Sequence, residues 1–325
     1  MQTTLETGPE LTCSQWSLDL AEPLAGTASP TRGYLLIEQS GPWGRDALVD
    51  SALDPALTAT LTAELGPRGL TPLLIRRPGR SPDRTHRGGR QVFAAVLGDE
   101  PVTVAFRVAD VAELASLSWA QFEAAGLPQI HPDAVPVTAG LALVCAHARR
   151  DRCCAAKGRP LAGYLDQLLR SESAATSYEP VWECSHLGGH RLAPTALLLP
   201  IGAVYGRLDQ QSLYAAHQAA QNSRVVPDLL RGMARYSKPV QAAEVAVRLR
   251  AGIDAVDYPE LVDRSTDGEL STVLFRDAAG RYWRVVVREQ PVAIARPESC
   301  AKSPARPTVC TVEQVVSVAG PRIDA

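Results

Sequence analysis

Residues that can bind metals are concentrated in two short blocks of the chain. The first block reads VCAHARRDRCCAAK at 144–157, and the second reads WECSHLGGHR at 182–191. Thiolate and imidazole groups bind zinc, copper and iron–sulfur clusters in proteins. Each block follows a short apolar run that predicts a strand, and loops at the carboxyl ends of strands are common ligand sites in α/β folds. The two blocks therefore predict a metal site.

The second block contains two histidines, His186 and His190, four residues apart. Zinc proteases use this spacing on a helix, as H-E-x-x-H with a glutamate base. Here Leu-Gly-Gly fills the interval, and each glycine disfavours a helix by about 1 kcal/mol relative to alanine. Glycines instead let the backbone wrap closely around a compact group. The pattern favours two imidazoles that converge from a loop; an ordinary glycine turn with two polar residues is the simpler alternative.

The cysteines of the first block are widely spaced. Eight residues separate Cys145 from Cys154, and seven separate it from Cys153. Zinc fingers and ribbons place about two to four residues between paired cysteines, so this spacing disfavours zinc. A wider loop suits a larger group, such as a binuclear iron–sulfur cluster. Rieske centres bind one iron of such a cluster through two histidines. The chain matches the first half of the Rieske pattern, C-x-H, at Cys145 and departs from the second half, C-x-x-H.

Three segments carry a resemblance to a known family. They are GTASPTRGYLLIEQSGPWGRDAL at 26–48, CAHARRDRCCAAKGRPLA at 145–162 and VWECSHLGGHRLAPTALLLPIGAVYGRL at 181–208. In this order they resemble the sucrase/ferredoxin-like family, whose ferredoxin part is similar to thioredoxin-like [2Fe-2S] ferredoxins. The resemblance covers most of the chain up to about residue 221.

The resemblance implies that two cysteines and two histidines bind one [2Fe-2S] cluster. The first cysteine of the family's C-x8-C maps onto Cys145. The second maps onto Cys154, and the adjacent Cys153 is the alternative. Thioredoxin-like ferredoxins take their other two ligands from a later C-x3-C, and these positions map onto His186 and His190.

The function implied is that of an electron carrier or redox protein, because such a cluster cycles between an oxidised and a one-electron-reduced state. Imidazole ligands reduce the negative charge on the cluster and should raise its potential relative to an all-cysteine ferredoxin. The expected partner is a redox protein that the sequence does not identify. Arg149, Arg150 and Arg152 predict a solvated basic rim, with orientation of that partner as a second role. His147 and Cys184 are expected near the cluster without being ligands.

Three other functions are possible. A zinc protein could use the same two cysteines and two histidines. A thioredoxin-type thiol oxidoreductase would need a C-x-x-C motif, which the sequence lacks. A glycoside hydrolase, suggested by the family name, would need two carboxyl groups at a set distance, and no motif supports one.

The composition excludes several classes of protein. Hydrophobic residues make up 46% and charged residues 21% of the 325 residues, which is enough for a folded core. A net charge of −2 argues against nucleic-acid binding. No apolar run reaches the roughly 18–20 residues that span a bilayer, and the first residues do not resemble a signal peptide. We therefore expect a cytoplasmic protein, in which seven cysteines favour metal binding over disulfides. Cys13, Cys300 and Cys310 are expected to be free thiols.

Apolar periodicity predicts the elements that position the two blocks. A helix after Asp54-Pro55 lies among expected strands at 34–38, 71–76, 91–97 and 102–107. A second helix, with Pro160 near its start, lies among expected strands at 140–144, 180–183, 195–199 and 203–207. Residues 1–33 are expected to be irregular. The fold class is therefore α/β, and the resemblance makes it a thioredoxin-like ferredoxin sandwich.

The repeated order of elements allows two thioredoxin-like units followed by a C-terminal α+β extension. We predict an N-terminal α/β unit at 1–135 and a thioredoxin-like ferredoxin domain carrying the cluster at 136–225. The extension at 226–325 has no role that the sequence assigns.

Overall fold

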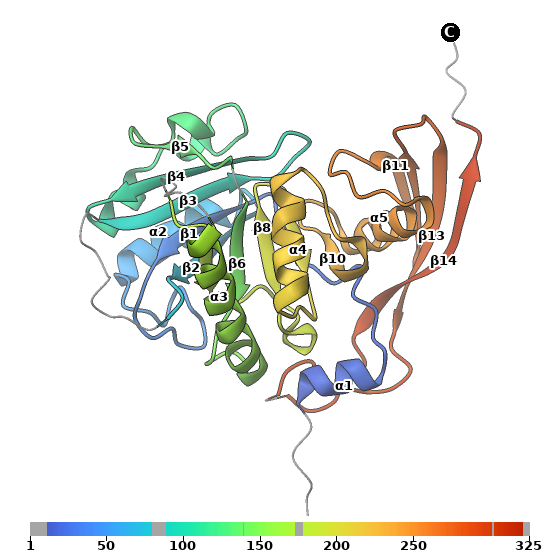
Figure 1. Ribbon diagram of the computed structural model, residues 1–325, viewed down its shortest axis with the longest axis horizontal. Coiled ribbons are helices and arrows are strands. Elements are labelled where there is room, and N and C mark those ends of the chain that lie inside the picture. The colour runs from blue at the N-terminus through green and yellow to red at the C-terminus, as the bar shows by residue number, and fades with distance from the viewer. Residues whose placement is uncertain (1–11, 80–88, 139, 173–177, 301, 321–325) are drawn as a thin grey trace, which may run out of the picture.

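The computed structural model describes residues 12–79, 89–138, 140–172, 178–300 and 302–320. Within these ranges, ten strands form one large curled sheet and four strands form a second, smaller sheet (Figure 1). Helices pack against both sheets. This arrangement confirms the predicted α/β class.

The first half of the large sheet contains the strands β1 (Gly33–Glu38), β2 (Leu70–Arg76), β3 (Arg90–Val96), β4 (Val102–Val108) and β5 (Val135–Pro136). β1 pairs in parallel with β2 and antiparallel with β3, which pairs antiparallel with β4. The helix α2 (Pro55–Leu65) connects β1 to β2. It begins as predicted, because the Asp54 carboxylate accepts the backbone N–H groups of Ala56 and Leu57 and Pro55 occupies the first turn.

The second half repeats this arrangement with the strands β6 (Leu141–Cys145), β7 (Val181–Cys184), β8 (Ala196–Leu199), β9 (Ala203–Tyr205) and β10 (Leu230–Met233). β6 pairs in parallel with β7 and antiparallel with β8, which pairs antiparallel with β9. These pairings match those of β1 to β4 in order and direction. The helix α3 (Arg152–Glu172) connects β6 to β7, and α4 (Gln210–Gln221) follows β9 with Asp209 as its cap.

The two halves join into one sheet through β2 and β7, which run antiparallel. Ile75 pairs with Cys184, and Arg76 pairs with Glu183. The sheet therefore continues across the predicted boundary at residue 135. β10 lies beyond the predicted boundary at residue 225 and pairs with β9 at the edge of the same sheet. The three-part division of the chain stays a prediction.

The helix α3 begins earlier than we predicted. Pro160 lies inside it, eight residues after its first residue, Arg152. The helix can start there because the Asp151 carboxylate accepts the backbone N–H of Cys153 at 2.8 Å, as a helix cap does. This earlier start places Cys153 and Cys154 in the first turn of a helix, not in a loop.

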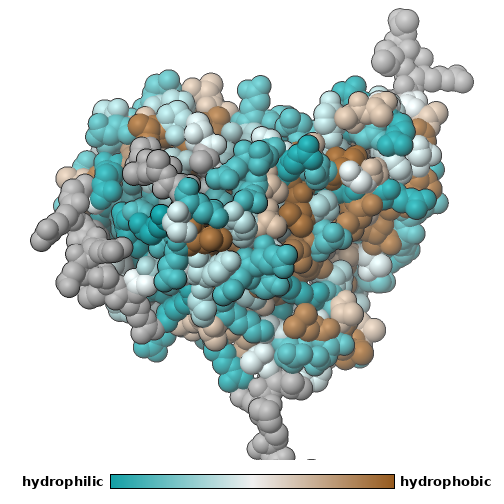
Figure 2. All heavy atoms as spheres, viewed as in Figure 1, coloured by the Kyte–Doolittle hydropathy of each residue, from teal (hydrophilic) through white to brown (hydrophobic). Residues whose placement is uncertain are grey.

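The small sheet contains β11 (Glu260–Asp267), β12 (Leu270–Arg276), β13 (Tyr282–Pro291) and β14 (Thr308–Val318), and the helix α5 (Lys238–Ala251) packs on it. The apolar residues at 271–276 and 282–288, on either side of the turn at 277–280, predict β12 and β13, whereas the sequence pattern does not predict β11 and β14. Trp283, Val285 and Val287 alternate along β13 and so share one face, and all three are buried in the core that also contains residues of α5. Figure 2 shows apolar residues gathered over α5 and the adjoining part of this sheet.

The N-terminal segment is not wholly irregular, contrary to expectation. The short helix α1 (Cys13–Asp19) begins at Thr12, whose side chain accepts the backbone N–H of Gln15. It lies beside the loop that connects β13 to β14 (Figure 1). The start of the described chain therefore meets residues near position 300.

Candidate metal centre

The first cysteine block is positioned by a close contact between β6 and α3. Cys145 is the last residue of β6, and it pairs in parallel with Cys184, the last residue of β7. Gly158 of α3 lies directly against this end of β6, since a Cβ at this position would be 2.0 Å from the Cys145 carbonyl oxygen. The missing side chain brings the first turn of α3, with Cys154, next to Cys145.

The structure brings all four predicted site residues into one group. The Cys145 thiol hydrogen-bonds with the side chains of Cys154 and His186. The Cys154 Sγ is 3.6 Å from His190 Nδ1. The rings of His186 and His190 are stacked, with centroids 4.0 Å apart and an angle of 10° between their planes. Two thiols and two imidazoles therefore occupy four corners of one small site.

The four side chains differ in exposure. Both thiols are buried, at 1% exposed each, and His190 is 9% exposed, whereas His186 is half-buried. Cys145 and Cys154 belong to the apolar core on one face of the large sheet. The site is therefore closed to solvent on the cysteine side and reaches the surface at His186.

Burial and mutual contacts set the protonation of the group. The hydrogen bond between the two thiols lowers the pKa of Cys145 well below its ordinary value and raises the pKa of Cys154. Contact with His186 lowers the pKa of Cys145 further. Burial lowers the pKa of His190 to about 4, so its imidazole is neutral. Thiolates and neutral imidazoles are the forms that bind metal ions.

The loop that follows β7 and carries His186 and His190, here called the histidine loop, needs its two glycines. Gly188 and Gly189 have φ angles of 76° and 68°, in the left-handed region that disfavours other residues. The Gly188 N–H donates to His186 Nδ1 at 3.3 Å, and a Cβ on Gly189 would be 2.6 Å from the guanidinium of Arg231. The predicted wrapping of a glycine loop around the site agrees with this geometry.

Arg231 holds the histidine loop in place through hydrogen bonds. It is fully buried, and burial lowers its pKa to about 10. Its guanidinium donates to the Gly188 carbonyl oxygen at 3.1 Å and to the Thr27 hydroxyl at 3.0 Å. One buried cation therefore ties the histidine loop to the segment before β1.

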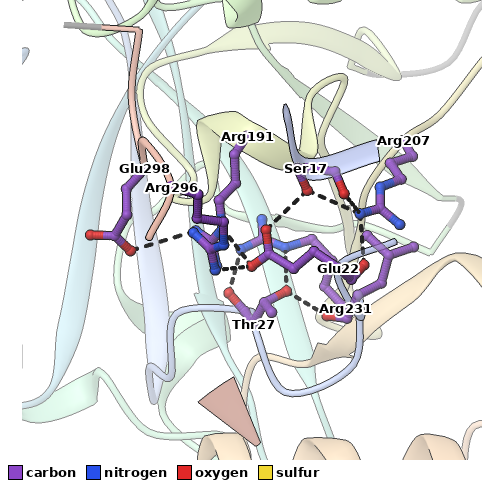
Figure 3. A network of polar contacts seen from close by, with 9 residues as sticks. Ser17, Glu22, Thr27, Arg191, Arg207, Arg231, Arg296 and Glu298 are labelled. Carbon is purple, nitrogen blue, oxygen red and sulfur yellow. Dashed lines mark hydrogen bonds and ion pairs between the residues drawn. The ribbon is translucent and has the colours of Figure 1, made fainter. Parts of the chain in front are cut away.

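A second buried network fixes the residue after His190 (Figure 3). Arg191 donates to the Glu22 carboxylate at 2.7 Å, and Arg296 donates to the same oxygen. The Ser17 hydroxyl donates to the other oxygen of Glu22 at 3.0 Å. Since Glu22 and Arg296 are almost fully buried, the network joins the histidine loop, the N-terminal segment and the C-terminal tail into one unit.

His147 and Cys184 lie beside the four residues and have other partners. His147 donates from Nε2 to the Gly44 carbonyl oxygen at 2.7 Å, and its ring meets the edge of Trp43. Cys184 is fully buried, and burial raises the pKa of its thiol.

A hollow of about 420 Å³ opens next to His186. Its lining includes charged and polar side chains on the side of the site: Arg45, Asp46, His147, Arg150, Ser185 and His186. Arg149, Arg150 and Arg152 are all exposed, in agreement with a solvated basic rim. His186 is thus the member of the group that faces an accessible, polar surface.

A second group of metal-binding side chains lies next to the first. It consists of Cys13, Asp151, Cys153 and Cys300, whose ligand atoms all lie within 4.8 Å of one another. Cys13 and Cys300 are free thiols, as expected, but the structure brings them together with Cys153 and Asp151, which the sequence did not predict. The two lie 287 positions apart in the sequence, so no local spacing could reveal the group. Cys310 is buried elsewhere, against Gly26, and burial raises its pKa to about 11.

Comparison with known proteins assigns the family. No curated protein and no solved structure matches the chain. Within the described residues, no helix combines the length and the apolar character that crossing a membrane requires. The family model described as sucrase/ferredoxin-like matches residues 24–232, which include both cysteine and histidine blocks and all of the large sheet except Met233, the last residue of β10. The chain belongs to the sucrase/ferredoxin-like family.

Proposed function

We propose that the protein is an electron carrier that binds one [2Fe-2S] cluster through Cys145, Cys154, His186 and His190. The observation that carries the proposal is the convergence of these two thiols and two imidazoles from β6, α3 and the histidine loop. When bound, the cluster would supply a one-electron redox centre. The ferredoxin part of the family name supports the same function.

The width of the site favours a binuclear cluster over a single zinc ion. Tetrahedral zinc with thiolate ligands needs ligand atoms about 4 Å or less from one another. Among the described residues, the one set of metal-binding side chains with all ligand atoms within 4.8 Å is the group of Cys13 and its neighbours. Each of the four proposed ligands contacts two of the others, in the order Cys145, Cys154, His190 and His186. The four ligand atoms are not all within 4.8 Å of one another, and this wider spacing suits two metal ions side by side.

The topology supports a thioredoxin-like ferredoxin. In each half, two parallel strands joined by a helix are followed by two antiparallel strands, in the spatial order 2-1-3-4. In the second half, the ends of β6 and β7 and the first turn of α3 provide the positions of the proposed ligands. We infer that each half is a thioredoxin-like unit and that the second carries the cluster.

The protein's own residues would control access to the redox centre. The buried cysteines and Trp182 exclude water on the inner side. His186 faces the hollow, so an electron would pass most directly through its ring. Arg150 lines this hollow, and Arg149 and Arg152 are exposed close to it in the sequence. These charges favour a redox partner with an acidic surface, because opposite charges steer the encounter.

The carboxylates near the four proposed ligands do not support a glycoside hydrolase. Two buried carboxylates flank the group, and both have other partners. Asp151 accepts the backbone N–H groups of Cys153 and Cys300, and Glu183 accepts a hydrogen bond from Arg76 at 2.8 Å. Neither is free to act as one of the paired carboxyl groups that glycoside hydrolysis requires.

Anaerobic purification followed by iron, sulfide and visible-absorption measurements tests the proposal. We expect a reddish-brown protein with two irons and two sulfides per chain. Cys154→Ser should lose the colour. Cys184→Ala, which removes a buried thiol outside the group, should keep it. A colourless protein whose zinc disappears in Cys154→Ser would show that the four residues bind zinc instead.

A further inference from the structure

Three thiols and a carboxylate converge at a point where three distant segments of the chain meet. Cys13 comes from α1, Cys153 from the first turn of α3, and Cys300 from the loop between β13 and β14 (Figure 1). Cys13 Sγ is 3.6 Å from Cys153 Sγ and 3.5 Å from Cys300 Sγ. Cys153 Sγ and Cys300 Sγ are 3.3 Å apart. The Asp151 carboxylate oxygens lie 3.7 and 3.8 Å from Cys13 Sγ.

This geometry matches a single tetrahedral ion. With zinc–sulfur bonds of about 2.3 Å, the edges between sulfur atoms of a tetrahedral site are about 3.8 Å long. The three thiols form a nearly equilateral triangle with edges close to that length. A disulfide would use two of the three sulfurs and leave the third without a partner.

Backbone and side-chain donors hold the four ligands in place. Asp151 accepts the N–H groups of Cys153 and Cys300, each at 2.8 Å, and a hydrogen bond from the Ser299 side chain, and the four lone-pair sites of its carboxylate leave one for a metal. The Cys13 N–H donates to Cys300 Sγ at 3.5 Å. Such donors orient ligands and support negative charge on sulfur in metal sites.

Hydrogen-bond donors surround Cys153. The Cys13 thiol lies 3.6 Å from Cys153 Sγ, and Ser14 also hydrogen-bonds with Cys153. The Ser14 hydroxyl in turn accepts from Lys157 Nζ at 2.7 Å, which brings a positive charge close to the group. A positive charge near the thiols favours the thiolate forms that metal binding requires.

We propose that Cys13, Cys153, Cys300 and Asp151 bind one zinc ion. All four positions of a tetrahedron are filled by the protein, which is the pattern of structural zinc and not of catalytic zinc, where one position stays open. Binding displaces the protons that remain on the three thiols and creates four metal–ligand bonds. The ion fastens α1 and the C-terminal tail to the first turn of α3.

The site also supports the neighbouring group. Cys153 precedes Cys154 directly, and the helix that carries both starts at the residue after Asp151. A zinc ion bound to Cys153 and Asp151 would fix that turn and so position Cys154. The zinc proposal does not depend on the iron–sulfur proposal, because the two groups share no ligand.

Metal analysis of the full chain tests the site. Protein produced with zinc in the growth medium and purified without chelators should contain one zinc per chain. Cys13→Ser and Cys300→Ser should each lose the zinc. The matched control, Cys310→Ser, removes a buried thiol outside both groups and should keep it. Iron and sulfide are assayed in the same samples, so zinc loss and cluster loss are read separately.

X-ray absorption at the zinc edge of the wild type keeps the test decisive if a variant does not fold. We expect three sulfur atoms at about 2.3 Å and one oxygen at about 2.0–2.2 Å. Absence of zinc from the wild type would overturn the proposal. So would a zinc shell of two sulfurs and two nitrogens, or a mass loss of two hydrogen atoms that maps to a disulfide between Cys153 and Cys300.

Discussion

Cys153 and Cys154 are consecutive residues, yet their thiols belong to two different groups. Cys153 Sγ lies 3.3 Å from Cys300 Sγ, whereas Cys154 Sγ lies 3.6 Å from His190 Nδ1. Consecutive side chains on an α-helix point about 100° apart, since 3.6 residues make one turn. The first turn of α3 can therefore serve two sites at once, which explains a doubled cysteine that the spacing alone left ambiguous.

This separation predicts different losses for two neighbouring substitutions. Cys154→Ser should remove most of the iron and the visible absorption, because it deletes a buried thiol that we propose as a cluster ligand. Cys153→Ser should lose the zinc and retain most of the iron, because it loosens the turn that positions Cys154 without removing a proposed cluster ligand. Iron, zinc and sulfide contents of both variants measure the outcome. Loss of iron in Cys153→Ser alone, with iron retained in Cys154→Ser, would shift the ligand assignment by one residue.

The reduction potential should fall as pH rises. A ligating imidazole keeps a remote N–H whose pKa is higher when the iron is reduced. Between the two pKa values, one proton enters with one electron, and the potential falls by about 59 mV per pH unit. Since cysteine carries no such proton, His186→Cys and His190→Cys should lower the potential and flatten its pH dependence.

Protein-film voltammetry between about pH 6 and 10 measures this dependence. His217→Gln, a substitution of a buried histidine on α4, is the control and should leave the potential unchanged. A pH-independent potential in the wild type would contradict the prediction. Electron paramagnetic resonance of the reduced protein would then separate histidines that are not ligands from ligands sealed from solvent.

Gly158→Ala should push α3 away from β6. The added Cβ would meet the Cys145 carbonyl oxygen at 2.0 Å, a backbone atom that cannot move aside easily. Overpacking of this kind costs about 1–3 kcal/mol of unfolding free energy and here should also reduce iron content. Gly163 lies in the same helix with open space around it, so Gly163→Ala should raise the free energy of unfolding by up to about 1 kcal/mol. Urea unfolding and iron assays compare the two; equal behaviour would refute the packing argument.

His217 should make the protein less stable in mild acid. Its Nε2 donates to the Gly140 carbonyl oxygen at 2.9 Å, and burial lowers its pKa in the folded state. Below about pH 6.5 the unfolded chain takes up a proton that folded His217 resists. Its contribution is complete above that pH and declines as pH falls toward the folded-state pKa, by at most about 1.4 kcal/mol per unit.

His217→Gln keeps a donor of similar reach and removes the titration. Urea midpoints of the wild type and the variant, compared from pH 5 to 7.5, measure the effect. The difference between the two proteins should change with pH below about 6.5 and be constant above it. A difference that is constant throughout would contradict the assignment.

Much of the fold around the site was predictable because its signals are local. Asp54-Pro55 marked the start of α2, and the apolar runs before each cysteine and histidine block marked β6 and β7. The Leu-Gly-Gly interval between His186 and His190 indicated a loop, in agreement with the positive φ angles there. These features depend on a few neighbouring residues, which a sequence displays directly.

Other elements depend on contacts that no short window contains. α1 is seven residues long, too short to be stable alone, and it is held by contacts to the histidine loop and to Cys300. β14 did have a local signal, since Thr308–Val318 is rich in valine and threonine, but the preceding prolines obscured it. The convergence of Cys13, Cys153 and Cys300 is visible only in three dimensions.

The ion pair between Glu22 and Arg296 connects the N-terminal and C-terminal segments of the chain, so the residues between them form one long loop. The two residues lie 274 positions apart, and closing a loop of that length costs roughly 5 kcal/mol of chain entropy more than a contact between neighbours. Such a contact forms late in folding, after local elements have shortened the path between its ends. Once formed, the ion pair has a consequence for proteolysis. If a protease cut the chain once in an exposed turn between the two residues, such as the turn at Gly280, the ion pair would still connect the two fragments.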